Sequence, residues 1–426
     1  MRLFLGISTV VLLVAVIILA GIVGWLVYTR QPYEQPFRPD APQYGQRGEY
    51  TVGVQEFTLS GENRTLNGWV WYPAQGNQEL ATYTEFNGIF ETSGRANWNV
   101  EPLSDNPPYP LVVFSHGSGS SPLLSLFFVE HLASHGFVVI AVEHRGNTMI
   151  DRIGDGDAYD AAVVDNYVHR PRDVSRAIDY ALDELNTGSL SGMIDPDKIA
   201  VSGHSFGGYT SFASAGASLN IDALQSWCDE NSGVLMGDLR DEAALTESNR
   251  DVELNDGVCY LIDDAPRMAE LAGLDDVPAG QWASFGDERI SAVIALTPWN
   301  APIFGEESLS ELQLPTLILV GSNDNTTQAE RDARNFYEWI GSENKMLVEF
   351  VLGDHAIFID NCPPALINIG SFGACSDPVW DLTRAHDVTN HLATAFLLST
   401  FYDDADAAIA LETDNIDFAG VTVQAP

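Results

Sequence analysis

Six short apolar runs that alternate with helix-like stretches constrain the fold of this 426-residue chain more than any other feature. Such runs have no polar face, so both of their faces must be buried, as in a parallel sheet covered by helices. The stretches between them, for example 170–185 and 328–341, have helical periodicity. The runs are PLVVFSHG (110–117), GFVVIAVEH (136–144), KIAVSGHS (198–205), ISAVIALTP (290–298), PTLILVGS (315–322) and MLVEFVLG (346–353). The alternation predicts one α/β domain with a mainly parallel central sheet flanked by helices.

The first 29 residues differ from the rest of the chain. Residues 3–28 carry no charge; as a helix at about 1.5 Å per residue they would extend roughly 39 Å, enough to cross a bilayer of about 30 Å with tilt. We expect a transmembrane signal-anchor over residues 1–29, with the bulk of the chain outside the cytoplasm, at the cell surface or in the periplasm. A cleaved signal peptide is the alternative, although its apolar stretch is usually only about 7–15 residues long.

The remaining chain divides by composition. Residues 30–48 are rich in proline and glutamine and predict an extended linker before a domain at 49–426. That domain opens with two alternating segments that predict an antiparallel strand pair. A long connection follows the helix after residue 205 and predicts an inserted cap at about 215–288. The acidic stretch 151–160, DRIGDGDAYD, lacks the spacing of a calcium loop and predicts a solvated loop.

The charge balance excludes some partners. The chain has 60 acidic and 20 basic residues, a formal net charge of −40. Nucleic-acid binding and electrostatic attraction to anionic lipids both need cationic patches, so neither is expected. Only Lys198 and Lys345 are lysines. This composition fits a protein of a saline habitat and an acidic secreted protein equally well.

Four cysteines predict two disulfides. Cys228, Cys259, Cys362 and Cys375 form no CxxC spacing, which gives no indication of a zinc or redox site. An even count in an oxidising compartment favours pairing, with three possible connectivities. Sequential pairing, Cys228 with Cys259 and Cys362 with Cys375, closes the shortest loops and is our expectation. Four buried free thiols are the alternative.

Ser205 lies between Gly203 and Gly207, directly after an apolar strand and before a helix-compatible segment. This context gives the G-x-S-x-G motif its meaning, because a tight strand-to-helix turn excludes bulky neighbours and exposes the serine hydroxyl. The turn also places the serine at the positive end of the following helix. We predict that Ser205 is a nucleophile; an incidental serine in a glycine-rich turn is the alternative.

A serine nucleophile needs a histidine base, which in this architecture follows it in the chain. His355 comes just after the last predicted strand, at the sheet edge where Ser205 should lie. His386 and His391 fall in a predicted helix and are expected to pack or hydrogen-bond there. We therefore predict His355 as the base.

The base in turn needs an orienting acid between the serine and the histidine in the chain. Asp324 follows the strand PTLILVGS and leaves room for a helix and a strand before His355. Asp354 is the weaker candidate. We predict Asp324 as the acid.

The amides that stabilise an oxyanion are expected on two loops. One is the amide of Phe206, next to the nucleophile, and the other is the amide of Ser118, where Gly117 and Gly119 let the backbone turn. The side chains of Phe206, Trp299 and Phe358 are candidates for an acyl pocket, although core packing explains some of them equally well.

Several segments in order carry a resemblance that covers about residues 50–420. They are GVQEFTLSGENRTLNGWVWYPA, LVVFSHGSGS, VVIAVEHRGNT, RPRDVSRAIDYAL, VSGHSFGGYT, GDHAIFIDNC and RAHDVTNHLATAFL. The chain resembles the α/β-hydrolase group that contains platelet-activating-factor acetylhydrolases and bacterial dienelactone-hydrolase-like proteins. The resemblance implies a triad of Ser205, Asp324 and His355. The acetylhydrolases take their acid one strand earlier, where this chain has Thr297 and Pro298, and dienelactone hydrolases use a cysteine nucleophile.

Together these features predict a membrane-anchored serine esterase that needs no cofactor or metal. Its expected substrates are small-molecule or lipid esters with short acyl groups, including truncated phospholipids or polyester fragments. A peptidase or amidase with the same triad is one alternative. A catalytically inactive binding module with the hydrolase fold is the other.

Overall fold

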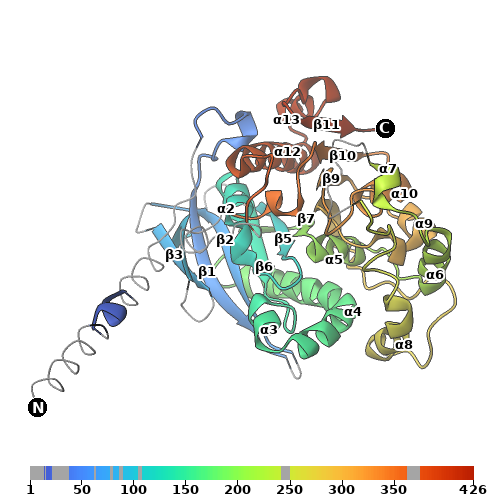
Figure 1. Cartoon of the computed structure of the whole chain (residues 1–426). Coiled ribbons are helices and arrows are strands. Elements are labelled where there is room, and N and C mark those ends of the chain that lie inside the picture. The colour runs from blue at the N-terminus through green and yellow to red at the C-terminus, as the bar shows by residue number, and fades with distance from the viewer. Residues whose placement is uncertain are drawn as a thin grey trace, which may run out of the picture.

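The computed structural model describes residues 14, 16–21, 38–61, 64–76, 80–85, 90–103, 108–240, 250–361 and 375–426. Within these ranges eleven strands form one sheet in the order β11-β10-β9-β8-β7-β5-β6-β2-β1-β4-β3 (Figure 1). The strands are β1 (Thr51–Leu59), β2 (Leu66–Ala74), β3 (Leu80–Glu85), β4 (Phe90–Trp98), β5 (Tyr109–Ser115), β6 (Val138–Val142), β7 (Ile194–His204), β8 (Ile290–Leu296), β9 (Thr316–Gly321), β10 (Lys345–Phe350) and β11 (Val421–Gln424).

The centre of the sheet is parallel, as the apolar runs predict. Strands β6, β5, β7, β8, β9 and β10 pair in parallel from neighbour to neighbour. β1 and β2 form the expected antiparallel pair, and β2 joins them to β6. Strands β3, β4 and β11 were not predicted. β4 pairs in parallel with β1 and antiparallel with β3, and β11 is antiparallel to β10.

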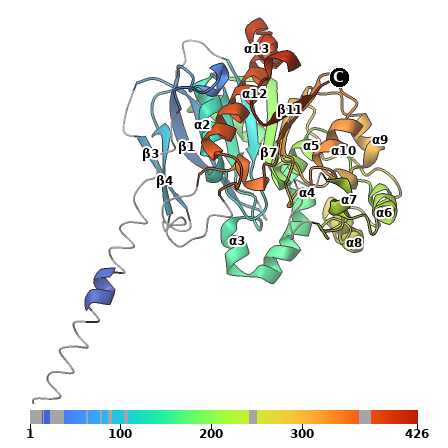
Figure 2. The same cartoon turned by 45° about the horizontal axis from the view of Figure 1, so that its top comes forward.

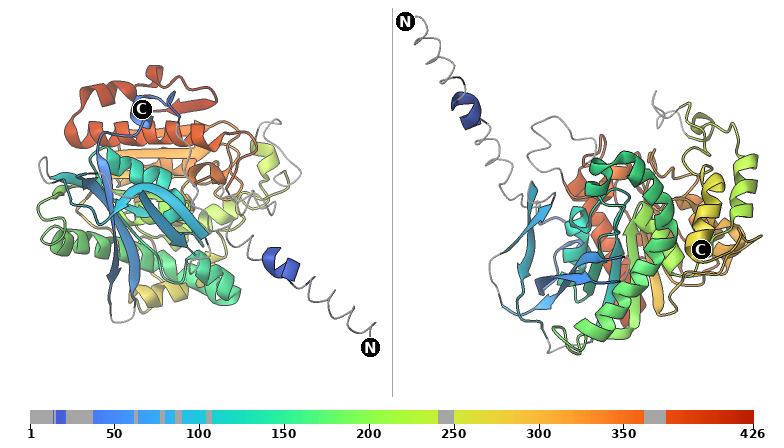
Figure 3. Two further views of the ribbon diagram at one scale, coloured as in Figure 1. Left: turned by 90° about the vertical axis from the view of Figure 1, so that its left-hand side faces the viewer. Right: turned by 90° about the horizontal axis from the view of Figure 1, so that it is seen from below.

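Helices cover both faces of the sheet. Alternate strand residues point to opposite sides, so Val112 and Val139 pack in one apolar core while Val113 and Ile140 pack in the other. The first core lies under α2 (Leu126–Ser134) and α12 (Leu382–Tyr402), which run over the strands in Figure 2. The second lies under α4 (Gly156–Tyr180), α5 (Phe206–Ser214) and α10 (Ala333–Trp339), and Figure 3 shows α4 on the side of the sheet opposite α12.

Shorter elements complete the domain. The α-helices are α3 (Met149–Gly154), α9 (Gly305–Ser310) and α13 (Ala405–Ala410). The 3₁₀ segments are η1 (Gln43–Gly45), η2 (Pro122–Ser125), η5 (Ala301–Ile303), η6 (His355–Phe358) and η7 (Thr413–Asn415), and the π-helical η3 (Ala181–Leu185) extends α4.

The region of the expected cap contains α6 (Ile221–Glu230), α7 (Met236–Leu239) and α8 (Leu261–Ala272). A disulfide joins Cys228 to Cys259, with 6.0 Å between the Cα atoms, which confirms the first expected pair. The second expected pair includes Cys362, which lies outside the described residues. Leu224, Leu261 and Met268 pack in the same core as the α5 side of the sheet, so α6 and α8 are anchored to the main body.

The prediction of a solvated loop at 151–160 is wrong. These residues form most of α3 and the start of α4. Thr148 and Asp151 form a reciprocal capping box at α3, and the Asp155 side chain accepts from the N–H of Ala158 at the start of α4. Carboxylates at helix N-termini satisfy free N–H groups and interact favourably with the helix dipole, so an acidic stretch can begin helices.

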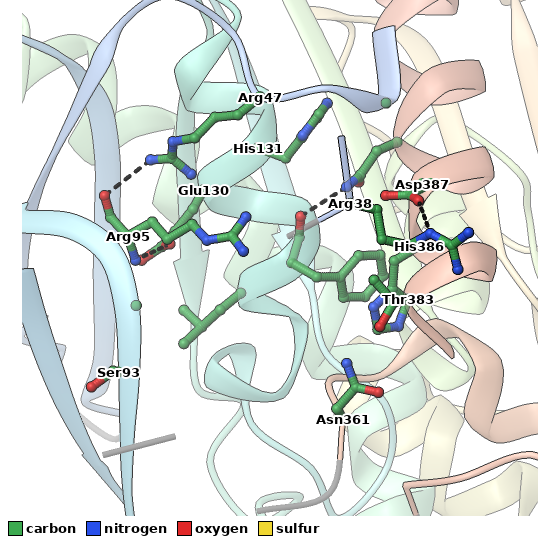
Figure 4. Close-up of a pocket in the computed structure, with 15 residues that line it drawn as sticks. Arg38, Arg47, Ser93, Arg95, Glu130, His131, Asn361, Thr383, His386 and Asp387 are labelled. Carbon is green, nitrogen blue, oxygen red and sulfur yellow. Dashed lines mark hydrogen bonds and ion pairs between the residues drawn. The ribbon is translucent and has the colours of Figure 1, made fainter. Parts of the chain in front are cut away.

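The described part of the expected linker, residues 38–48, packs against the domain. Tyr44 is buried, its N–H donates to His391 Nδ1 at 3.1 Å, and its carbonyl oxygen lies 2.8 Å from His131 Nε2. Figure 4 shows Arg38 and Arg47 in a small pocket between α2, α12 and β4. These contacts tie residues 38–48 to α2 and α12, so this part is not an extended spacer.

The expected membrane anchor falls mostly on residues outside the described ranges. The described part, residues 14 and 16–21, is helical. Among the described residues, no helix has the length and apolarity that crossing a membrane would require.

Candidate active site

Ser205 forms the turn between β7 and α5. Its backbone has φ 59° and ψ −119°, a strained conformation for a residue other than glycine. A Cβ on Gly203 would lie 2.3 Å from the Gly207 carbonyl oxygen, and one on Gly207 would lie 1.8 Å from the Ser115 carbonyl oxygen. Both positions therefore require glycine. The Ser205 N–H donates to the Leu296 carbonyl oxygen at 2.9 Å, which fixes the turn against β8.

Asp324 and His355 form a direct acid–base pair after β9 and β10. Asp324 Oδ2 lies 2.7 Å from His355 Nδ1. Asp324 is fully buried and accepts further hydrogen bonds from the Thr327 hydroxyl at 2.8 Å and from the amides of Thr326 and Thr327 at 2.8 and 2.9 Å. The hydroxyl of Thr297, at the end of β8, donates to the same carboxylate. Thr297, which follows the strand before β9, thus holds Asp324 in place by a hydrogen bond.

The pKa shifts of this pair follow from their contact. Burial alone would raise the pKa of Asp324, but the charge of His355 and the hydrogen bonds hold that pKa well below its usual range. Burial would lower the pKa of His355, but the Asp324 carboxylate more than offsets it and raises that pKa. The Asp324 carboxylate accepts a hydrogen bond from Nδ1–H of His355. In the neutral ring the proton is therefore on Nδ1, and Nε2 has a free lone pair.

His204, the residue before Ser205 in the chain, packs against His355. The rings of His204 and His355 have centroids 4.7 Å apart, and His204 Nε2 lies 3.3 Å from the His355 carbonyl oxygen. Burial lowers the pKa of His204 to about 3, so its ring is neutral. Among the described residues no hydrogen bond joins Ser205 to His355, a contact that catalytic pairs often make only with substrate bound.

The expected oxyanion donors lie on two neighbouring segments of the main chain, the loop after β5 and the start of α5. A Cβ added to Gly117 would lie 3.4 Å from Ser205 Cβ, so the loop after β5 borders Ser205. In that loop the Ser118 hydroxyl accepts from Asn147 Nδ2 at 3.0 Å and lies 2.7 Å from the Tyr159 hydroxyl. α5 begins at Phe206, so the Phe206 amide is one of the donors that a helix leaves unpaired in its first turn.

The expected acyl-pocket side chains are placed differently from one another. Phe358 is fully buried beside Phe350 in the core under α12, so its assignment to a substrate cleft does not fit the structure. Phe206 is only 3% exposed, and its ring packs against Tyr167. Trp299 is partly exposed and donates from its indole to the Tyr167 hydroxyl at 2.6 Å. Apolar character and nearness in sequence to the site residues do not separate a core residue from a cleft residue.

The alternative acid and bases have other partners. The Asp354 carboxylate accepts from the His355 N–H at 2.7 Å and caps η6. His386 lies 2.9 Å from the Ile359 carbonyl oxygen and lines the pocket of about 50 Å³ in Figure 4. Burial lowers the pKa of His386 to about 3 and that of His391 to about 4. Neither histidine contacts Ser205.

Sequence reasoning missed the buried polar side chains behind the site. Arg170 on α4 donates to the carbonyl oxygens of His116 and Gly117. Arg240, after α7, donates to the Asp324 carbonyl oxygen at 2.7 Å and forms an ion pair with Glu330 at 3.0 Å. In the sequence these arginines are marked only as polar residues in segments near strand ends. Such residues are common on any protein surface, so they do not indicate a role at the site.

Three family profiles match parts of the chain. Residues 88–152 match "Platelet-activating factor acetylhydrolase, isoform II", residues 124–220 match "Prolyl oligopeptidase family", and residues 264–371 match "PET hydrolase-like". The first range contains Ser118, the second contains Ser205, and the third contains both Asp324 and His355. Together they span every expected catalytic position.

Curated relatives and a solved structure agree with these profiles. A platelet-activating factor acetylhydrolase of Canis lupus familiaris is 34% identical over 220 residues, 38% of this chain and 49% of that protein. Cutinase est1 of Thermobifida alba is 32% identical over 104 residues, 24% of this chain and 29% of the cutinase. The structure of a ferulic acid esterase from Streptomyces cinnamoneus matches with a TM-score of 0.54 and 18% identity, over 89% of this chain and 97% of that one.

The chain belongs to the α/β-hydrolase superfamily. It spans about half the length of the curated acetylhydrolases that it matches. In this fold Asp324 follows β9 and His355 follows β10, and the Thr297 hydroxyl at the end of β8 donates to Asp324.

Proposed function

We propose that the chain is a serine carboxylic-ester hydrolase that acts through Ser205, His355 and Asp324 and forms an acyl-enzyme. The observation that carries the proposal is the 2.7 Å contact of the buried Asp324 with the partly exposed His355, at the sheet edge that also holds the strained Ser205 turn. Backbone strain at a residue other than glycine persists only where the surrounding structure enforces it, and it concentrates at functional sites.

In this mechanism His355 Nε2 accepts the Ser205 proton as the serine Oγ attacks the ester carbonyl carbon. Asp324 keeps the Nδ1 proton in place and stabilises the imidazolium. The amides of Ser118 and Phe206 donate to the oxyanion. The imidazolium then protonates the leaving alcohol, and His355 activates a water that hydrolyses the acyl-enzyme and restores Ser205.

Short-acyl esters are the proposed substrates. The named relatives include acetylhydrolases and cutinases, and together they support esters over other acyl compounds. Truncated phospholipids and polyester fragments are the two subclasses to compare.

The proposed location is the outer side of a membrane, with residues 1–29 as the anchor. The uncharged run at 3–28 supports an anchor. The Cys228–Cys259 disulfide supports an oxidising compartment, since structural disulfides are rare in the cytosol.

The test uses the full-length chain in detergent with a fluorophosphonate probe and p-nitrophenyl butyrate. The expected result is labelling and hydrolysis that both disappear in Ser205→Ala. A wild-type chain that is neither labelled nor active would refute the esterase and favour a binding module.

A peptidase with the same triad is the second candidate, because the prolyl oligopeptidase profile covers the Ser205 turn. Aminoacyl anilides distinguish the two. Anilide cleavage with a higher kcat/KM than that for p-nitrophenyl butyrate would replace the esterase by the peptidase.

A further inference from the structure

A buried arginine lies directly behind the loop that carries Ser118. Arg170 is 0% exposed, and its Nη1 donates to the His116 carbonyl oxygen at 2.6 Å. Its Nη2 donates to the Gly117 carbonyl oxygen at 3.2 Å and to Asn147 Oδ1 at 2.6 Å. We propose that Arg170 is a positioning residue that aims the oxyanion donors of the ester hydrolysis, an inference that rests on the proposed function.

Peptide geometry connects Arg170 to the Ser118 amide. The Gly117 carbonyl and the Ser118 N–H belong to one planar trans peptide, so they point in opposite directions. Because Arg170 holds that carbonyl toward the protein interior, the Ser118 N–H points away from Arg170. A Cβ on Gly117, the residue before this amide, would lie 3.4 Å from Ser205 Cβ, so the loop borders Ser205. We infer that the Ser118 amide faces the Ser205 side.

The same guanidinium also contacts the ring of Phe206, whose amide is the second expected donor. Arg170 Cζ is 4.6 Å from the centroid of the Phe206 ring. Asn147, which accepts from Arg170, also donates to the Ser118 hydroxyl at 3.0 Å, and its carbonyl oxygen accepts from the Gly119 N–H at 3.0 Å. One side chain therefore contacts the residues on both sides of the expected oxyanion.

Arg170 forms no close ion pair, although the Asp173 carboxylate acts on it at longer range. Among the described residues no carboxylate lies within 4.0 Å of it. The nearest acid on its own helix, Asp173, pairs instead with Arg64 at 2.7 Å and with His144 at 3.0 Å. Burial lowers the pKa of Arg170 to about 9, so the side chain remains charged at neutral pH. A buried cation that lacks a close ion-pair partner is costly, but it favours an anion that forms nearby.

A second serine–histidine–aspartate array supports this arrangement. The Ser115 hydroxyl lies 2.9 Å from His144 Nε2, and His144 Nδ1 lies 3.0 Å from Asp173 Oδ2. All three residues are at most 1% exposed, so no substrate reaches Ser115. The His144 N–H donates to His116 Nε2 at 3.0 Å. The array fixes the end of β5, and Arg170 fixes the loop that follows.

The test compares Arg170→Lys, which keeps the charge but not the planar fork, with Arg170→Gln, which keeps N–H donors without charge. Both should lower kcat on p-nitrophenyl butyrate by about 10–100-fold, less than the roughly 10²–10³-fold that loss of one direct donor causes. KM should change less than about threefold. The affinity for a trifluoromethyl ketone, whose adduct carries an oxyanion, should fall by the same factor as kcat/KM.

Active-site titration with a fluorophosphonate corrects each rate for the folded fraction, and Tyr83→Phe is the control for stability alone. Tyr83 is buried, and its hydroxyl lies 2.7 Å from Glu130, with no contact to the oxyanion loop. This variant should unfold at lower temperature with unchanged kcat.

Variants of Arg170 that keep kcat within twofold of the wild type, or that retain ketone affinity while kcat/KM falls, would overturn this role. If Arg170→Gln does not fold, the kinetics and ketone affinity of Arg170→Lys alone decide whether Arg170 has this role. An inactive and unlabelled wild type would instead refute the proposed function and this inference with it.

Discussion

Replacing Gly207 by alanine tests how tightly the serine turn and the oxyanion loop are packed. An ideal Cβ on Gly207 would lie 1.8 Å from the Ser115 carbonyl oxygen, whereas real Cβ atoms essentially never approach closer than 3.0 Å. The two backbones must therefore separate by at least 1.2 Å. Ser115 ends β5 and leads into the loop of Ser118, so this separation moves Ser205 away from the Ser118 amide.

The magnitude follows from that displacement. A misplacement of about 1 Å in a reacting group costs about 10²-fold in rate. Overpacking a rigid site lowers the free energy of unfolding by about 1–3 kcal/mol. We therefore expect Gly207→Ala to reduce kcat/KM for p-nitrophenyl butyrate about 100-fold and to lower the unfolding free energy, measured in urea, by about 1–3 kcal/mol.

Gly156→Ala is the matched control. A Cβ on Gly156, at the start of α4, would have no neighbour within 4 Å. Its kcat/KM and urea midpoint should both equal those of the wild type. A Gly207→Ala enzyme with kcat/KM within threefold of the wild type would show that the turn tolerates the displacement, and the geometric argument would fail.

Three further perturbations address the acid, the cap and the disulfide. Asp324→Asn removes the carboxylate that raises the pKa of His355. Since acylation needs neutral His355, the acidic limb of the kcat/KM–pH profile should shift to lower pH, and the plateau should fall on the order of 10⁴-fold. An acidic limb at the wild-type pH would contradict the pairing of Asp324 with His355. Arg240→Gln removes the donor that holds the Asp324 carbonyl oxygen at 2.7 Å, so kcat should fall about tenfold at unchanged KM; steady-state kinetics with a wild-type kcat would exclude a role in positioning. The double variant Cys228→Ser/Cys259→Ser opens a link across 31 residues and should lower the unfolding free energy by about 3–4 kcal/mol in urea, a loss that an unchanged midpoint would disprove.

The central strands and the order of the site residues could be predicted because the chemistry is local. β5, β6 and β9 are buried at every position, so each appears in the sequence as an unbroken apolar run. Ser205, Asp324 and His355 each follow the carboxyl end of such a run. Parallel strands bring those ends to one edge, which is enough to place the three residues together.

The rest depends on contacts between distant parts of the chain. Arg170 lies 54 positions from His116, and nothing in its own helix distinguishes it from a solvent-exposed arginine. Residues 151–160 resemble a loop by composition, and only the caps at Thr148 and Asp155 reveal the helices. Phe358 follows His355 closely in sequence, but the η6 turn directs it into the core.

The proposed site is best tested by a crystal structure of the fluorophosphonate adduct of the 426-residue chain. We expect phosphorus bonded to Ser205 Oγ, with the phosphoryl oxygen about 2.7–3.1 Å from the amide nitrogens of both Ser118 and Phe206. Phosphorus on another side chain, or a phosphoryl oxygen that contacts neither amide, would contradict it.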